Sequence, residues 1–273
     1  MNTFRFSAIG LAAAALGLGL AACSDSPTSA GADFVSDSTV TADVAVSAGD
    51  EIASSVSTLS ANEAAASLDV GAGGGGTGAP AYALNVSRSR TCYDASGAVV
   101  DGCKPLSSVR KIVTHAESSG SRSVSNETEG GNTVTWSGSA SRVSDDTLLR
   151  NFDTGTPPSE TSRTHAGLTV GADTTAFASA QTTRDMSEAF TDRIVGVTWN
   201  VPRSSNPFPI SGTIYRSDTV HVAVTRGTTT KTRDTTRNVE VDFPADAQGN
   251  VVMKVNDKTC NLNLVTHAVS GCH

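Results

Sequence analysis

The chain has 273 residues, with 20 Lys and Arg against 27 Asp and Glu, which gives a formal net charge of -7. Aromatic residues make up only 5% of the sequence and charged residues 17%. This balance argues against a nucleic-acid-binding protein, because that class needs a basic face.

The first residues have the pattern of a secretory signal, which we place at residues 1–22. Met1 to Phe6 contain Arg5, and Ala8 to Ala22 are almost entirely Ala, Leu, Ile and Gly. A membrane-spanning helix needs about 20 mostly apolar residues. Here the apolar run is shorter and a polar segment, Ser24-Asp25-Ser26-Pro27, follows at once. The pattern therefore favours a cleaved signal over a membrane span.

The signal ends in Leu20-Ala21-Ala22-Cys23, which resembles the lipobox of bacterial lipoproteins. The resemblance implies that the Cys23 thiol receives a diacylglyceryl group, that the chain is cut before this residue, and that the new amine is acylated. Two or more acyl chains hold a protein stably on a membrane. We therefore expect a protein of the bacterial cell envelope, anchored through lipidated Cys23. Ser24 after the cysteine, in place of Asp, favours the outer membrane over the inner.

Residues 23–80 have the composition of an acidic tether rich in Ala, Ser and Gly. From Ser24 to Ser87 there is no Lys or Arg, and the net negative charge of the chain resides in this stretch. A helix is possible over 50–68, where Ile52, Val56 and Leu59 share one face, either docked on the following domain or transient. The run Gly71 to Gly78 matches a dinucleotide fingerprint, but no strand precedes it, so we predict a hinge and no cofactor.

Four further cysteines, Cys92, Cys103, Cys260 and Cys272, predict disulfides in an exported chain. Three pairings are possible, and the sequence favours the local pairs Cys92–Cys103 and Cys260–Cys272. The first pair would close a hairpin with Gly97-Ala98 at its turn. These spacings are too wide for a structural zinc site, so no metal is predicted.

Residues 81–273 predict an all-β domain, a single antiparallel meander that forms a curved sheet, a thin sandwich or a partly open barrel. Apolar residues alternate with polar ones in several segments. The residues expected to share one face within each strand are Val134 and Trp136; Val195, Val197, Trp199 and Val201; Val220, Val222 and Val224; Val239, Val241 and Phe243; and Met253 and Val255. Turns are expected at Ser119-Gly120, Gly130-Gly131-Asn132, Pro157-Pro158, Arg226-Gly227, Gln248-Gly249-Asn250 and Asn256-Asp257, and a helical turn at Asp185 to Phe190. A membrane barrel is disfavoured because tracts such as Thr228 to Arg237 are too polar for lipid.

The sequence contains no catalytic motif that we can identify, neither a Gly-x-Ser-x-Gly elbow nor a His-Glu-x-x-His helix. Thr-His-Ala occurs three times, at His115, His165 and His267, which is more typical of polar strand or turn residues than of clustered metal ligands. The recurrent arginines Arg216, Arg226, Arg233 and Arg237 are expected to form cross-strand pairs with Asp218, Asp234, Glu240 and Asp242.

We therefore expect a membrane-anchored envelope lipoprotein that acts as a non-enzymatic binding or interaction module, with no nucleic acid among its partners. Its partner would be an envelope protein, a glycan or a lipid. One alternative is a lipid carrier with a cavity lined by Val197, Trp199, Val222 and Val241. Another is an envelope hydrolase with a His–carboxylate or Ser–His pair in a pocket. A third is a structural spacer without any pocket.

Overall fold

A computed structural model describes residues 85–127, 133–179, 182–203 and 206–273, together with Gly49, Ile52, Ala53 and Val56. The described strands form one antiparallel sheet in the order of the chain, β1 to β10, as the sequence predicts. Their bounds are β1 Asn85–Tyr93, β2 Lys111–Glu127, β3 Thr133–Phe152, β4 Glu160–Ala178, β5 Thr182–Asn200, β6 Ser211–Arg226, β7 Thr229–Asp242, β8 Asn250–Val255, β9 Lys258–Asn263 and β10 Val269–Ser270. Two short 3-10 helices, η3 (Asp101–Cys103) and η4 (Leu106–Ser108), lie between β1 and β2.

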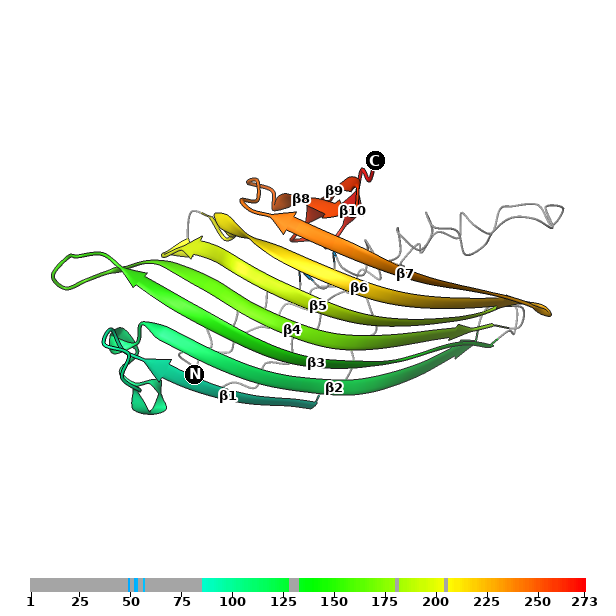
Figure 1. Cartoon of the computed structure of the whole chain (residues 1–273), viewed down its shortest axis with the longest axis horizontal. Coiled ribbons are helices and arrows are strands. Elements are labelled where there is room, and N and C mark those ends of the chain that lie inside the picture. Colours follow the sequence, from blue (N-terminus) through cyan, green and yellow to red (C-terminus); the bar gives the residue numbers. More distant parts are fainter. Residues whose placement is uncertain are drawn as a thin grey trace, which may run out of the picture.

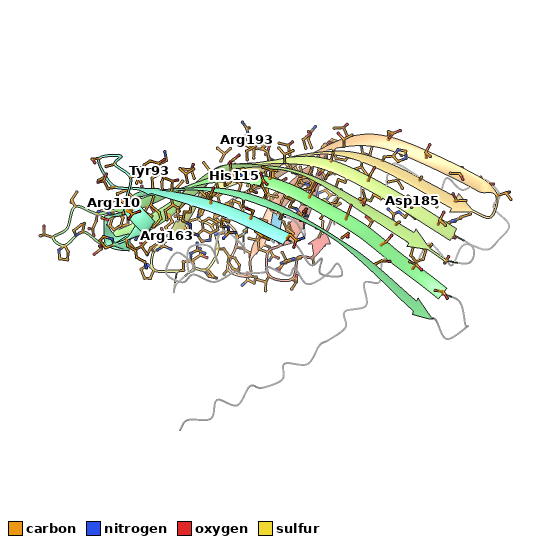
Figure 2. The ribbon with its side chains drawn as sticks, turned by 90° about the horizontal axis from the view of Figure 1, so that it is seen from below. Tyr93, Arg110, His115, Arg163, Asp185 and Arg193 are labelled. Carbon is orange, nitrogen blue, oxygen red and sulfur yellow. A yellow bond between two sulfur atoms is a disulfide. The ribbon has the colours of Figure 1, made fainter. Side chains whose placement is uncertain are left out.

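The long strands β2 to β7 form an arched surface, and the short strands β8 to β10 continue it at the C-terminal edge (Figure 1). Figure 2 views this arch from another side, with β8 to β10 beneath it. Side chains alternate between the two faces of each strand. We call the face that carries the buried apolar residues the inner face, and the opposite one the outer face. The sheet is open, and β1 is one of its edges.

The main core lies at the end of the inner face near β7 to β9. It joins Trp199 of β5 and Ile214 of β6 to the apolar residues of the last strands. The buried members from β7 to β9 are Val239, Val241, Phe243, Val251, Met253, Val255, Cys260, Leu262 and Leu264. The alternation predicted for these strands is therefore confirmed.

Part of this core comes from the predicted tether. Gly49, Ile52, Ala53 and Val56 are helical, and the last three are buried among the core residues of the sheet. A Cβ at Gly49 would lie 3.2 Å from Leu262 Cδ1 and would also clash with Val269, so the chain here packs tightly on the last strands. The helix face predicted from Ile52 and Val56 thus packs on the sheet, whereas Leu59 lies outside the described residues.

The prediction that Val195 shares a face with Val197 and Trp199 is wrong. The pairing of β5 with β6 shifts between Val195 and Thr198, and Gly196 within this bulge has φ 62°. A bulge adds one residue and reverses the alternation beyond it. Val195 is therefore 44% exposed on the outer face, while Ile194, Val197 and Trp199 are buried. Val201 lies beyond the end of β5.

Two other local expectations are corrected, and two more lie outside the described part. Asp185 to Phe190 is part of β5 and not a helical turn, and Ser119-Gly120 lies within β2 and not in a turn. Both segments pair with neighbours on either side, and these long-range ladders override the local preferences. The side chains of Val134 and Trp136 and the turn at Gly130 to Asn132 lie outside the described residues.

Both local disulfides predicted from the sequence are present, Cys92–Cys103 and Cys260–Cys272. Gly97 has φ 84°, as the predicted turn requires. That turn is longer than the expected two residues, because the Asp94 N–H donates to the carbonyl of Ala98. In the second loop, which has no central glycine, His267 adopts φ 60°.

The predicted signal at residues 1–22, Cys23, and the boundary of the tether at residue 80 lie outside the described residues. Among the described residues, none belongs to a helix with the length and apolar character needed to cross a bilayer.

Candidate binding site on the outer face

The middle of the inner face is occupied by buried ion pairs. Arg216 of β6, with a fully buried side chain, binds Glu188 at 2.6 Å and Asp192 at 3.3 Å through its terminal nitrogens. Its Nε donates to Asp218 at 2.5 Å, and its Cζ lies 3.8 Å from the centroid of the Phe190 ring. Three carboxyl groups therefore surround one guanidinium, where an apolar core would normally continue.

This crowding changes the proton affinity of the buried carboxyl groups. Burial, assisted by the neighbouring Glu188 and opposed by Arg216, raises the pKa of Asp218 to about 8. Burial also raises the pKa of Asp192, against the effect of Arg216. The second carboxyl oxygen of Asp218, Oδ2, is buried without a hydrogen-bond partner among the described residues. Protonation of this carboxyl is therefore favoured relative to an exposed aspartate, and the cluster is a structural element of the sheet.

A second ion-pair group lies at the other end of the inner face. Arg150 donates to Glu160 at 2.7 Å and 2.9 Å, and Arg163 donates to the same carboxylate at 2.7 Å and 3.0 Å. Arg150 also binds the carbonyls of Leu106 and Val109. Although burial acts in the opposite direction, the two arginines lower the pKa of Glu160 to about 2. This group fastens η4 to the sheet.

The residues proposed to line a lipid cavity are divided between two clusters. Val197, Trp199 and Val241 belong to the main core and are fully buried. Val222 belongs to a separate cluster with Val220 and Val224. None of the four lines either of the two hollows described below.

The outer face is covered mainly with small hydroxyl side chains. Along β2 to β6 these are Ser119, Ser121, Ser123, Thr135, Ser137, Ser139, Ser141, Thr174, Thr183, Ser187, Thr191, Ser217, Thr219 and Thr225. Cross-strand hydroxyl contacts join some of them, such as Ser139 Oγ and Thr174 Oγ1 at 2.8 Å. Such pairs stabilise the sheet locally and leave a broad surface of donors and acceptors.

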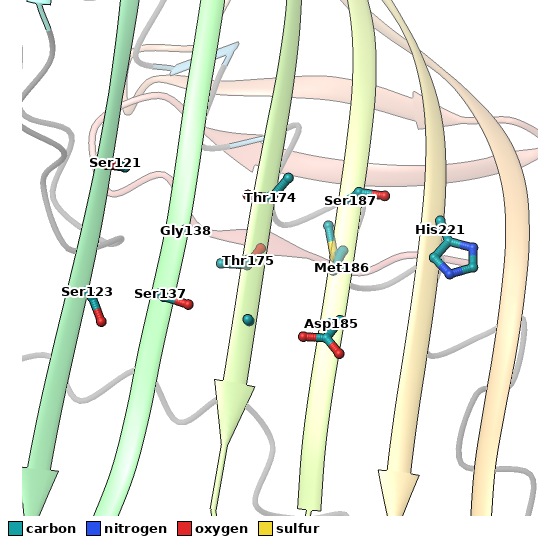
Figure 3. A pocket seen from close by; sticks show the side chains of 11 residues that line it. Ser121, Ser123, Ser137, Gly138, Thr174, Thr175, Asp185, Met186, Ser187 and His221 are labelled. Atoms are coloured by element: carbon teal, nitrogen blue, oxygen red, sulfur yellow. The ribbon is translucent and has the colours of Figure 1, made fainter.

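A hollow of about 530 Å³ crosses this surface from β2 to β6 (Figure 3). Its polar side chains on the outer face are Ser121, Ser123, Ser137, Thr174, Asp185, Ser187 and His221, with Ala176 among them. Gly138, Thr175 and Met186 also border it, although in the register they share the inner face with Val222. Among the described residues that line it there is no Lys or Arg. This size lies within the range of small-ligand sites, although the hollow is shallow where such sites are usually enclosed.

Three residues of this region have the identities of a hydrolytic triad. His221 lies between Ser187 of β5 and Asp234 of β7 in the register of the sheet, and its Nδ1 is 2.7 Å from Asp234 Oδ1. Ser187 makes no hydrogen bond to His221 in the described part of the chain. The backbone N–H groups of β5 face two paired strands, so they are not available as an oxyanion hole. Within the described residues, the arrangement therefore lacks both the Ser–His hydrogen bond and the oxyanion hole that acyl transfer requires.

The other histidines do not join His221. His115 lies on the outer face, 2.8 Å from Asp145 and 3.3 Å from Glu117, and these hydrogen bonds raise its pKa. His165 is buried on the inner face, 3.1 Å from Asp146 and edge-on to Trp199. His267 lies in the turn before β10. The three Thr-His-Ala sequences thus occupy unrelated positions, and no metal-binding group of His, Cys, Asp or Glu is found in the described ranges.

A second hollow, of about 460 Å³, lies on the same face over β4 to β8. Arg193 and Tyr215 form its centre, with the guanidinium carbon 4.9 Å from the ring centroid. Arg193 projects from the convex side of the sheet (Figure 2). Lys254 at its rim is held by Glu240 at 2.5 Å and Asp242 at 3.1 Å. An exposed leucine, Leu168, adds an apolar contact surface.

Several of the acidic residues predicted to pair with the recurrent arginines contact other partners, while Asp218 is the direct cross-strand neighbour of Arg237. Asp234 binds His221, while Glu240 and Asp242 bind Lys254. Arg216 binds Asp218 two residues away on its own strand. His221 with Asp234 and Lys254 with Glu240 are direct cross-strand neighbours, and the sequence pattern did not single out His221 and Lys254 as the partners of these carboxylates. The hollow itself was missed, because serines and threonines are too common in this sequence to single out a group of them.

Compared with models of known protein families, with curated proteins and with solved structures, the chain has no significant match.

Proposed function

We propose that this chain is a lipid-anchored protein of the bacterial cell envelope whose β domain is a non-enzymatic binding module for a neutral glycan. The observation that carries the proposal is the hydroxyl-lined hollow on the outer face, together with the lack of any Lys or Arg in its lining. The Cys23 lipobox supports the location.

The lining fits a polyhydroxyl ligand better than other classes. Serine and threonine hydroxyls both donate and accept hydrogen bonds, and Asp185 adds an acceptor that matches a pair of sugar hydroxyls. An anionic ligand is disfavoured, because the described lining contains the carboxylate of Asp185 and neither Lys nor Arg. Ala176, on the outer face, supplies a small apolar contact for the C–H face of a sugar.

Binding is tested with the full mature protein and insoluble glycan. We expect the wild type to sediment with insoluble chitin, a neutral glycan, and chitotetraose to compete for it. Ser137→Trp and Ser187→Trp fill the hollow and should abolish the interaction. The matched control Ser89→Trp lies on the outer face of β1, away from the hollow, and should bind as the wild type does. Equal binding by all variants, or none by the wild type, rejects the proposal.

The anchor is tested separately by mass spectrometry of the N-terminal peptide from the membrane fraction. We expect mature chains that begin at Cys23 and carry its acyl groups, and Cys23→Ser should keep the leader. A mature chain with an unmodified Cys23 thiol would contradict the anchoring proposal and leave the binding proposal intact.

One observation favours a hydrolase as the second candidate, namely the register Ser187, His221 and Asp234. Ester hydrolysis with p-nitrophenyl acetate separates the two functions. Activity that is lost in both Ser187→Ala and His221→Ala, but kept in Ser121→Ala, would support the hydrolase. No activity above the buffer rate is the result that the binding module predicts.

A further inference from the structure

The second hollow of the outer face forms where long side chains stand beside short ones. One row of outward-facing residues consists of direct neighbours on strands β4 to β8, namely Leu168, Arg193, Tyr215, Glu240 and Lys254. The adjacent row on β5 to β7 consists of shorter polar residues, namely Thr191, Ser217 and Asn238. The step between the two rows leaves a space of about 460 Å³, which lies within the range of small-ligand sites. The hollow is therefore built by the register of the sheet.

Arg193 carries the uncompensated charge of this hollow. It is exposed, and within the described part of the chain its guanidinium contacts the Tyr215 ring and no carboxylate. Its outward-facing neighbours in the register are apolar or carry hydroxyl groups, among them Leu168, Val170, Thr191, Val195 and Ser217. The N–H donors of Arg193 are thus available to a ligand.

The other charged groups at the hollow neutralise one another. Lys254 Nζ donates to Glu240 at 2.5 Å and to Asp242 at 3.1 Å. Glu240 lies on β7, two strands away from Arg193 on β5, or roughly 10 Å across the sheet. The positive charge that remains on this part of the outer face therefore belongs to Arg193.

Tyr215 holds the guanidinium in position. The centroid of its ring lies 4.9 Å from Arg193 Cζ, within the range of a cation–π contact. A side chain that is already held in place loses less conformational entropy when it binds a ligand. The planar guanidinium presents pairs of N–H groups that match the two oxygens of a carboxylate. The chemistry at Arg193 therefore favours a carboxylate ligand.

The residues around Arg193 fit a sugar that carries this carboxylate. The hydroxyls of Thr191 and Ser217 and the amide of Asn238 can donate and accept hydrogen bonds, as sugar hydroxyls require. Leu168 is 45% exposed and offers an apolar surface to the C–H face of a sugar ring. We propose that this hollow binds an acidic saccharide, a uronic acid whose carboxylate pairs with Arg193.

This inference is independent of the proposed neutral-glycan binding. The two hollows share no described residue, and the lining of the first contains Asp185 where the second contains Arg193. The two ends of the outer face would therefore select saccharides of different charge. Because each site is tested with its own probe, the failure of one proposal does not decide the other.

Isothermal titration calorimetry of the full mature protein with trigalacturonic acid tests the proposal. The methyl ester of this trimer is the matched probe, since it has the same sugar skeleton and no charge. We expect saturable binding of the acid, weakened in about 1 M NaCl as ion pairs are screened, and binding of the ester at least about tenfold weaker. Equal affinity for acid and ester, or no saturable binding of the acid, would overturn the proposal.

Substitutions at Arg193 locate the site. Arg193→Gln removes the charge and should weaken binding of the acid by at least about tenfold. Arg193→Lys keeps the charge without the planar pair of donors, so we expect an intermediate affinity. The matched control is Lys111→Gln, at a cation 5.2 Å from the Tyr93 ring centroid and outside both hollows, which should bind as the wild type does. An equal loss in Lys111→Gln would indicate general electrostatic attraction and contradict a site at Arg193.

Two further measurements define the ligand class. Tyr215→Phe keeps the ring and should retain binding, whereas Tyr215→Leu should weaken it. Inorganic phosphate should displace trigalacturonic acid only at a large excess. Displacement at equal concentration would assign the hollow to a simple anion and overturn the proposal. Circular dichroism checks that each variant keeps the fold.

Discussion

The ring of Phe190 on β5 lies directly over the Cα of Gly171, its paired neighbour on β4. A Cβ at Gly171 would clash with three atoms of this ring. The opposite side of the contact is fixed as well, because Arg216 lies on the same ring and is held by three carboxyl groups. The glycine is required here for close packing, and the ring has no free space into which it can move.

Gly171→Ala should therefore destabilise the protein. Overpacking of a filled core costs about 1–3 kcal/mol, and urea unfolding followed by circular dichroism measures it. The control is Ala172→Ser, on the exposed outer face of the same strand, which should change the free energy of unfolding by less than about 0.5 kcal/mol. Equal stability of Gly171→Ala and wild type would show that Phe190 does not occupy this position.

Ile52→Ala tests whether the helical residues before the domain are part of its core. Ile52 is 1% exposed among the core residues of the sheet. Truncation of a buried isoleucine costs about 2–5 kcal/mol. Val99→Ala, at a residue that is 67% exposed, should leave the unfolding midpoint unchanged. A similarly small effect of Ile52→Ala would mean that the helix does not stabilise the domain.

The fold class followed from the sequence because its main signals are local. The alternation in Val220 to Val224 and in Val239 to Phe243 reports which face is buried, and glycine at position 97 reports a positive φ. Val195 was assigned to the wrong face, because alternation alone does not reveal a bulge. Gly196, which adopts a positive φ within the bulge, was the residue that could have indicated it.

The candidate site could not be predicted from the sequence as the fold class was. Ser187 and His221 are 34 positions apart and meet only through the register of β5 with β6. A serine in a Ser/Thr-rich sequence carries no sign of its strand neighbours. The disulfides, in contrast, were predictable, since each closes a short loop with a separation of 11 or 12 residues.

The stability of the protein should depend on pH through Asp218. Its pKa is raised to about 8 in the folded protein, whereas an unfolded aspartate has a pKa of about 3.9. Between these values the folded state binds the additional proton, so stability falls as pH rises from 5.5 to 8. Asp218→Asn keeps a neutral side chain and should reduce this slope.

Thermal unfolding at a series of pH values provides the measurement. Asp185→Asn, at an exposed aspartate on the outer face, is the matched control and should keep the wild-type slope. If Asp218→Asn and the wild type lose stability in parallel between pH 5.5 and 8, then Asp218 is already ionised in this range.

Loss of the Cys92–Cys103 disulfide should destabilise the edge strand β1 near η3. Cys92 and Cys103 belong to a small cluster with Val109, Ile112 and Leu148. Closing a loop of about this length contributes roughly 3 kcal/mol in the chain-entropy model. The Cys92→Ser, Cys103→Ser double variant should lose about that amount in denaturant unfolding. It should also exchange the amide hydrogens of β1 faster, while those of β8 stay protected.

The central claim is that the outer-face hollow binds a neutral glycan, and titration of the ¹⁵N-labelled mature protein with chitotetraose tests it most directly. The account predicts that the amide signals of Ser137, Thr174, Ser187 and His221 shift in a saturable manner. Signals of Thr91 and Ser270, near the two edges of the sheet, should stay in place. A spectrum without saturable shifts, or shifts concentrated away from the hollow, would contradict it.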